Sequence, residues 1–183
     1  MRSARSWLKA SSLGAAAGLL IVLPLPPAGR SGSCEYRADG YATPGFSMNP
    51  SQGVSRYEGT ISCQGEVSRR WVRPDKGTIR MVFYYGDDGV SSFRGGDDCL
   101  FSAGHGTIDV TLPTDRGNFS VQGTVESLGA LSGEVHGQLG SSLFAGVMVI
   151  TPDSNRPEET CVASNLQHSV AYGEMELSGL LPR

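Results

Sequence analysis

The most informative absence in this sequence is helical periodicity. Beyond the first thirty residues, no stretch of eleven or more residues repeats its apolar side chains every 3.6 positions. Also missing are the P-loop, the dinucleotide-binding G-x-G-x-x-G, the zinc motif H-E-x-x-H and the nucleophile elbow G-x-S-x-G. The first absence points to the all-β class. The others leave no motif in favour of an enzyme, and the sequence predicts no cofactor.

Long apolar runs are absent as well. The longest, Leu13 to Leu25, has about 13 residues, well short of the roughly 20 that cross a bilayer as a helix. Three basic residues precede this run and small residues follow it, which is the order of a secretory signal peptide. We expect residues 1–33 to be this peptide, with cleavage between 28 and 33. A single all-β domain is expected at 34–183, with no membrane span after processing. An uncleaved anchor is the alternative.

Lysine is rare. The chain has only Lys9 and Lys76, compared with thirteen arginines, a bias typical of bacterial composition. Removal of residues 1–33 leaves 11 basic and 18 acidic residues, a net charge of −7. A general nucleic-acid or anionic-membrane binder needs a basic face, so this charge argues against both classes. It favours solubility and a neutral or cationic partner.

Closely spaced cysteines are absent, which removes the usual spacing for zinc clusters and for thioredoxin-like chemistry. Four cysteines follow the signal peptide, and an even number in that context predicts disulfides and a secreted, extracytoplasmic protein. Of the three pairings open to them, we expect Cys34–Cys63 and Cys99–Cys161. The segment Ser31-Gly32-Ser33-Cys34 also resembles a bacterial lipoprotein processing site, which would lipidate Cys34. Ser31, however, stands where that site requires an apolar residue.

Alternation of apolar and polar residues runs through most of the chain. It is clearest from Gly117 to Pro152, where three alternating or apolar segments joined by short Gly/Ser-rich breaks predict a meander. Further strands are expected at 57–64, 77–86, 104–112 and 169–178, with an edge strand beginning at Cys34. The segment Leu143–Ile150 is apolar on both faces, so we interpret it as a central strand covered on both sides.

About eight to ten short strands with turn signals every 8–12 residues predict an antiparallel β-barrel or, alternatively, a β-sandwich. Glycine provides 21 of the 150 residues after Ser33, and several glycines stand in the middle of strands. Mid-strand glycine marks bends or a close approach of backbones, as a tightly coiled barrel requires. We therefore expect a single barrel stapled by two disulfides.

One segment concentrates positive charge on this acidic protein. Residues 65–76 surround Trp71 with four basic residues, namely Arg69, Arg70, Arg73 and Lys76. Stacking on the indole and pairing with guanidinium groups predict a site for an anionic or carbohydrate-like ligand. The alternative is a solvated loop whose Trp71 packs on the end of the barrel.

Two aromatic residues in the loop-rich segment 34–55 extend this candidate site. Tyr41 and Phe46 stand in a polar context of Gly, Pro, Ser and Asn. They would form a ligand-facing lip at the barrel mouth, or else plug one end of the core.

Two groups of residues invite a metal hypothesis. The first consists of four aspartates, Asp87, Asp88, Asp97 and Asp98. The second consists of three histidines on separate strands, His105, His136 and His168. The aspartate spacing matches no calcium loop, and histidine at a polar position is usually only polar, so we predict no metal site.

The sequence therefore favours a binding protein, with a small molecule in the barrel mouth or a partner at the surface. A structural or cell-surface interaction protein without a pocket is the first alternative, and a filled interior would favour it. A hydrolase-type enzyme is the second. Glu126 and Glu134 flank a hairpin as a catalytic carboxylate pair would, but both fall on the exposed face. The lipocalin signature G-x-W is absent, since Arg69 stands two positions before Trp71.

Overall fold

The computed structural model describes residues 32–49, 51–86, 99, 102–129, 131–162 and 165–179, so most of the predicted signal peptide lies outside it. The described residues form nine strands and no helix: β1 (Gly32–Phe46), β2 (Gly53–Val67), β3 (Arg70–Val72), β4 (Lys76–Tyr85), β5 (Ser102–Thr114), β6 (Gly117–Gly129), β7 (Ser132–Leu139), β8 (Ser142–Pro152) and β9 (Leu166–Gly179). In this part of the chain, no helix has the length and apolarity that a membrane crossing needs.

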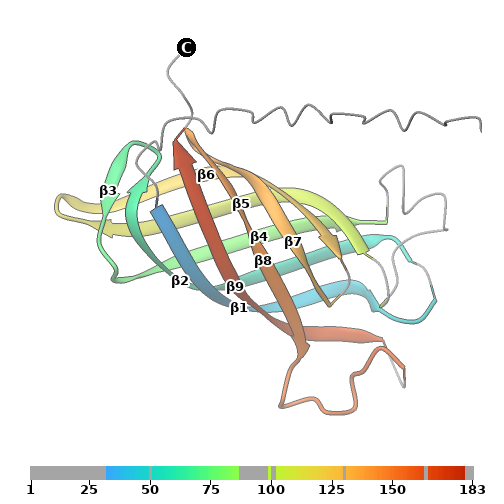
Figure 1. The fold of residues 1–183 in the computed structure, drawn as a ribbon. Helices are drawn as coiled ribbons and strands as arrows, with labels where there is room; N and C mark the ends of the chain where they lie inside the picture. The colour runs from blue at the N-terminus through green and yellow to red at the C-terminus, as the bar shows by residue number, and fades with distance from the viewer. Residues whose placement is uncertain are drawn as a thin grey trace, which may run out of the picture.

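Eight of the strands close into an antiparallel barrel (Figure 1). Their order is β1-β9-β8-β7-β6-β5-β4-β2, and the additional pairing of β1 with β2 completes the ring. β3 is an extra strand that pairs with the end of β2. Closure provides backbone partners for both edges that an open sheet would expose. The predicted barrel is thereby confirmed, and the sandwich does not form. β1, expected at an edge, pairs on both sides.

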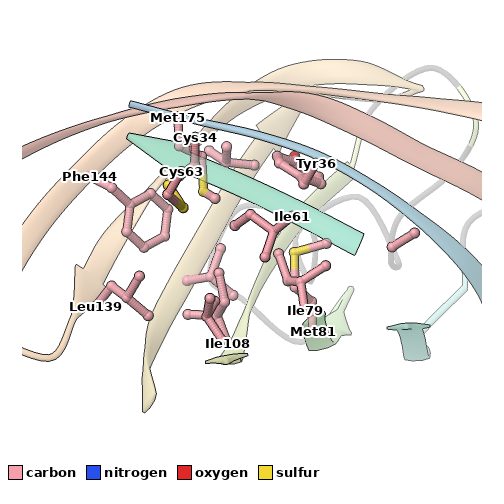
Figure 2. Packing of buried hydrophobic residues seen from close by; sticks show 14 of the residues in the cluster. Cys34, Tyr36, Ile61, Cys63, Ile79, Met81, Ile108, Leu139, Phe144 and Met175 are labelled. Carbon is pink, nitrogen blue, oxygen red and sulfur yellow. A yellow bond between two sulfur atoms is a disulfide. The ribbon is translucent and has the colours of Figure 1, made fainter. Parts of the chain in front are cut away.

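Alternate side chains of each strand point into the barrel and fill it. On β2, Tyr57 and Ile61 are each 1% exposed, whereas Glu58 and Thr60 between them face the solvent. Figure 2 shows the interior side chains, which come from strands all around the ring and meet in one cluster. Each fully buried aliphatic or aromatic side chain stabilises the fold by about 1.5–3 kcal/mol.

The prediction that Leu143–Ile150 is covered on both faces is wrong. Phe144 and Met148 are buried inside the barrel, but Leu143 and Val147 point outward and are 45% and 49% exposed. A single closed sheet has one inner face, and no second layer lies over the outside of β8 among the described residues. The sequence pattern correctly predicted an apolar strand, but the layer that we expected over its second apolar face is not present among the described residues.

Both predicted disulfides are confirmed. Cys34–Cys63 joins residues that face each other on β1 and β2, within the core (Figure 2). Cys99–Cys161 joins the β4–β5 connection to the β8–β9 connection, which follow strands on opposite sides of the ring. The second disulfide therefore crosses one end of the barrel. Closing chain separations of 29 and 62 residues contributes about 3–4 kcal/mol for each bond. Because its sulfur is in a disulfide, Cys34 has no thiol left for a lipid.

Both ends of the barrel are covered. At the end where β3 lies, called here the hairpin end, Val67 and Val72 are 0% and 1% exposed. At the opposite end, called the loop end, Phe46, Tyr85 and Leu166 pack in a cluster with Cys99. A cavity of ≈ 20 Å³ near the loop end has room for about one water molecule. The described interior is thus a packed core.

Two inward-facing glycines shape the wall formed by β8 and β9. A Cβ added at Gly146 would lie 1.9 Å from the carbonyl oxygen of Glu174, and one at Gly173 would lie 1.9 Å from that of Val147. Neighbouring backbones approach too closely here for any side chain, as the sequence predicted for mid-strand glycines. On the outer side, the same residues line a groove of ≈ 690 Å³.

Candidate functional site

The basic segment predicted as a loop contains a small β-hairpin. After β2 the chain reverses at Ser68 and Arg69, which have positive φ angles of 49° and 65°. β3 then pairs back on β2, with Glu66 opposite Trp71 and Val67 opposite Arg70. Left-handed backbone is uncommon outside glycine, asparagine and aspartate, so a Ser-Arg turn carries little sequence signal. We refer to residues 65–72 as the β2–β3 hairpin.

The hairpin is fixed to the body of the barrel. The Ser68 N–H donates a hydrogen bond of 2.9 Å to the Ser142 Oγ, and the Ser141 N–H donates one of 3.0 Å to the Ser68 Oγ. These bonds join the turn of the hairpin to the β7–β8 turn, and each contributes about 1 kcal/mol. Together with buried Val67 and Val72, they hold the hairpin in one position.

Trp71 points away from the barrel and is 68% exposed. Successive residues of a strand point to opposite faces, so burial of Val72 turns Trp71 outward. The alternative in which Trp71 packs on the barrel end does not occur. Tryptophan is strongly buried on average in folded proteins, and an exposed indole on a fixed element provides the kind of rigid anchor that dominates many interfaces.

The three arginines of the hairpin region play different parts. The Arg70 guanidinium lies 4.5 Å from the centroid of the Phe119 ring, a cation–π contact that braces the hairpin. Arg73 forms an ion pair with Asp115 in the β5–β6 turn. Arg69 is exposed and makes no ion pair or hydrogen bond with another described side chain. Arg69 is therefore the arginine that a ligand beside Trp71 can engage without breaking an existing contact.

Tyr41 and Phe46 lie at the loop end, far from the hairpin. β1 and β2 run antiparallel, so the last residues of β1 lie beside the first residues of β2, whereas the hairpin follows the last residues of β2. The Tyr41 and His168 rings have centroids 4.9 Å apart, and the Phe46 and Tyr85 rings have centroids 4.7 Å apart. The structure thus separates the predicted site into two places. Phe46 plugs the core, which was the alternative interpretation.

The three histidines do not form a site. The His136 Nε2 lies 3.1 Å from an oxygen of Glu126, and the His105 ring stacks on Tyr84. His168 contacts Glu159 on another wall. Among the described residues, no group of three or more His, Cys, Asp or Glu side chains is arranged to hold a metal ion. The four aspartates of the calcium hypothesis lie outside the described residues.

The two glutamates suggested as a catalytic pair do not stand directly opposite each other. Glu134 stands opposite Leu128 across the β6–β7 pairing, and Glu126 stands opposite His136. The two carboxylates are therefore in different rows of the sheet.

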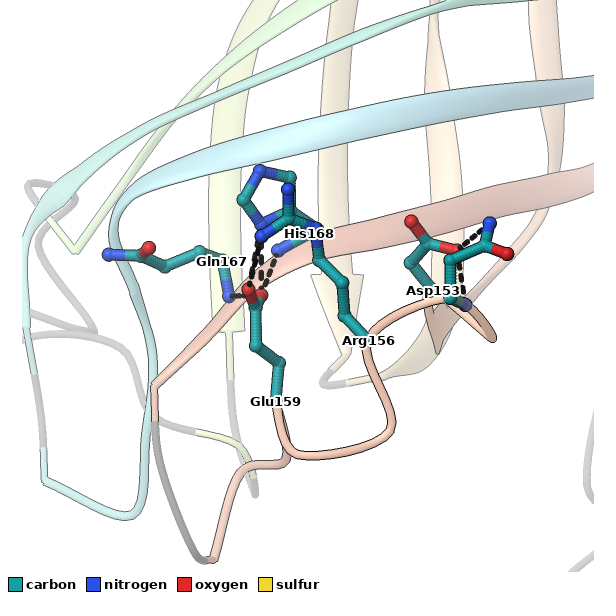
Figure 3. A network of polar contacts seen from close by, with 6 residues as sticks. Asp153, Arg156, Glu159, Gln167 and His168 are labelled. Atoms are coloured by element: carbon teal, nitrogen blue, oxygen red, sulfur yellow. Dashed lines mark hydrogen bonds and ion pairs between the residues drawn. The ribbon is translucent and has the colours of Figure 1, made fainter.

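A polar network at the loop end was not expected from the sequence (Figure 3). One Glu159 carboxylate oxygen accepts hydrogen bonds from the backbone N–H groups of His168 at 2.7 Å and Gln167 at 3.1 Å. The other oxygen lies 2.9 Å from the His168 Nδ1 and 3.3 Å from an Arg156 guanidinium nitrogen. The backbone donor of His168 is the main cause that lowers the pKa of Glu159. This network anchors the long connection before β9. An isolated glutamate in a polar loop has no periodic signal that would have revealed it.

The chain matches no protein-family model, no curated protein and no solved structure. Its two disulfides are compatible with an extracytoplasmic location. The structure itself defines the class, a closed disulfide-bonded β-barrel with a packed interior. An aromatic and basic hairpin is fixed at one end of that barrel.

Proposed function

We propose that the protein is a secreted, non-enzymatic binding module that recognises an anionic saccharide with the outer face of the β2–β3 hairpin. The observation that carries the proposal is Trp71, which is 68% exposed on a hairpin that hydrogen bonds and buried valines hold in place. A side chain that is already ordered loses little conformational entropy when a ligand binds, and this favours affinity.

The chemistry around Trp71 suits a ring that carries negative charge. A flat indole offers an apolar surface for the C–H face of a sugar, and an arginine can hold a carboxylate or sulfate through two parallel hydrogen bonds. Arg69 supplies that guanidinium. The ion pair between Arg73 and Asp115 brings the β5–β6 turn beside the hairpin, which adds exposed Arg116 to the same end.

The packed interior supports recognition on the outside of the barrel. Small-molecule pockets are typically 300–1,000 Å³, whereas the interior cavity near the loop end is ≈ 20 Å³. A ligand inside the barrel would therefore require the core to rearrange.

Intrinsic fluorescence tests the proposal directly, because Trp71 is the only tryptophan after residue 33. Heparin oligosaccharide and polygalacturonate serve as anionic probes, with neutral dextran as the uncharged control. We expect the anionic probes to quench or shift the emission. Trp71→Ala, followed by calorimetry, should weaken binding about 30-fold, the effect of losing a central aromatic anchor of about 2 kcal/mol. Arg69→Ala should weaken it less and reduce its salt dependence.

Tyr84→Ala provides the matched control, since Tyr84 is an exposed aromatic residue on the barrel wall (46%) outside the hairpin. The affinity of the Tyr84→Ala variant for the anionic probes should equal that of the wild type. Equal affinity of the Trp71→Ala variant and the wild type for every anionic probe would refute the proposal.

A structural or cell-surface interaction role is the second candidate, and the packed interior is the observation that favours it. The same titration separates the two candidates. A protein of this second kind would leave the Trp71 emission unchanged with all saccharides and would instead be retained on the surface of its host cell.

A further inference from the structure

We propose a second binding surface, one that recognises a positively charged partner rather than an anionic one. The outer groove over β7, β8 and β9 takes a segment of a partner protein that carries lysine or arginine beside apolar side chains. This inference does not depend on the saccharide site, because it concerns the wall of the barrel rather than its hairpin end.

One row of residues crosses neighbouring strands in register through the groove. Glu134, Val147 and Glu174 of this row line the groove, and the row continues beyond it on both sides. From β6 to β1 the row consists of Leu128, Glu134, Val147, Glu174 and Glu35. Leu128 is 51% exposed and Val147 is 49% exposed. Tyr172 stands in the next row and is 40% exposed. The result is an apolar floor with carboxylates on both sides of it.

The carboxylates that line the groove, and Glu35 beside it, are unpaired. Glu35, Glu134, Glu174 and Glu176 form no ion pair or hydrogen bond with any described side chain. Glu35 and Glu174 even stand directly opposite each other on β1 and β9. Like charges in that position destabilise a sheet. A local arrangement that lowers stability without a visible compensation is expected where a protein binds something.

The opposite wall of the barrel shows the contrast. A second concavity of ≈ 590 Å³ lies over β2, β4, β5 and β6. There the Arg80 Nε lies 2.9 Å from a Glu58 carboxylate oxygen, and the hydroxyls of Thr111 and Ser120 lie 2.8 Å apart. That concavity pairs its Glu58 carboxylate with Arg80, whereas neither Glu134 nor Glu174 of the groove has a partner among the described side chains.

Charge complementarity identifies the occupant. Neighbouring strands are about 4.8 Å apart, so Glu134 and Glu174 flank Val147 at about 5 Å on each side. A segment that presents an apolar side chain between two basic side chains on the same face complements this row. A second copy of the protein fits less well, because two bodies with a net charge of −7 after residue 33 repel each other.

The test uses the secreted protein and fluorescein-labelled twelve-residue peptides, with binding followed by anisotropy at low and physiological salt. The first peptide repeats the unit Lys-Ser-Val-Ser, which places lysine and valine on the same face of an extended chain. The second peptide replaces valine by serine, and the third replaces lysine by glutamate. We expect the Lys/Val peptide to bind, the Lys/Ser peptide to bind about tenfold more weakly, and the Glu/Val peptide not to bind.

Two groove variants locate the site. Glu134→Gln with Glu174→Gln should weaken the Lys/Val peptide about fivefold, the effect of two partly exposed ion pairs. Val147→Ser removes the apolar floor with the charge unchanged and should weaken it to a similar extent. Glu58→Gln with Asp109→Asn removes the same two charges from the opposite wall, so it should change the affinity less than twofold. Circular dichroism confirms that each variant is folded.

Three results would overturn the inference. The first is a lack of binding of the Lys/Val peptide. The second is an equal loss of affinity in the groove variants and in the Glu58→Gln/Asp109→Asn control, which would mean unspecific attraction to an acidic protein. The third is self-association, measured by sedimentation, that Val147→Ser abolishes, because the occupant would then be a second copy.

Discussion

Replacement of Tyr36 by phenylalanine should stabilise the barrel. Tyr36 on β1 is 5% exposed, and its hydroxyl has no hydrogen-bond partner among the described residues. Burial of an unpaired hydroxyl costs about 1–3 kcal/mol in protein mutational data. Phenylalanine keeps the ring in place and removes this cost. We expect the free energy of unfolding to rise by about 1 kcal/mol and Tm by about 2–4 °C.

Tyr57→Phe is the matched control with the opposite sign. Tyr57 is 1% exposed, and its hydroxyl lies 3.3 Å from the Ser169 Oγ. Removal of this bonded hydroxyl should lower the free energy of unfolding by about 0.5–1.5 kcal/mol. Urea unfolding at pH 8, followed by far-UV circular dichroism, measures both variants. A destabilised Tyr36→Phe variant, or a shift of both variants in the same direction, would contradict an unpaired hydroxyl on Tyr36.

The loss of stability at high pH gives an independent check on the burial of the Tyr36 hydroxyl. Burial, with a smaller contribution from nearby Tyr57, raises the pKa of Tyr36 above its ordinary value of 10.0. The folded state therefore holds the phenol proton more tightly than the unfolded state. The stability that this tighter binding contributes is complete below pH 10, and it is lost as the pH rises toward the pKa of Tyr36 in the folded state. Tyr36→Phe should reduce the loss of stability by about 1.4 kcal/mol per pH unit above about pH 10.5. An unchanged slope in urea unfolding would contradict the assignment.

Three further predictions concern the packing and the loops. Gly146→Ala should destabilise the fold by about 1–3 kcal/mol, because its Cβ would lie 1.9 Å from the carbonyl oxygen of Glu174. Gly179→Ala is the control, since a Cβ there has nothing within 4 Å, and it should change the stability by less than about 0.5 kcal/mol. Equal Tm values for the two variants would argue against the close approach at Gly146. Glu159→Gln should speed hydrogen exchange of the His168 amide at neutral pH. The wild-type protection should decline only as the pH falls below the usual carboxyl range, because the pKa of Glu159 is lowered; protection with no dependence on pH would exclude this anchor. Ser142→Ala should cost about 1 kcal/mol through the lost bond to the Ser68 N–H and weaken saccharide binding, and unchanged affinity would show that the hairpin does not need this bond.

The barrel was predictable because its signals are local and repeated. The alternation around Tyr57 and Ile61 indicated both the strand and its buried face, and the mid-strand glycines indicated a tightly coiled wall. The disulfide pairing was also predictable. Cys34 and Cys63 fall on the first two strands, which leaves Cys99 and Cys161 for each other.

Other parts of the structure depend on contacts that no local pattern encodes. β3 is three residues long and begins after a left-handed Ser-Arg turn, so the segment reads as a loop. The apolar outer face of β8 cannot be distinguished by sequence from a face that a second layer covers. The separation of Tyr41 from Trp71 could have been inferred, because the far ends of two consecutive antiparallel strands lie at opposite ends of a barrel.

The ring order has a consequence for how the protein folds. The eight strands of the ring are neighbours in the order in which they occur along the chain, but the ring closes only when β9 pairs with β1, where Gly32 meets Leu177. Contacts of such long sequence separation form slowly, because the whole intervening chain must be ordered or looped. During synthesis the barrel therefore has two open edges until its last strand is available. A chain shortened before β9 would expose β1 and β8 to pairing with other molecules.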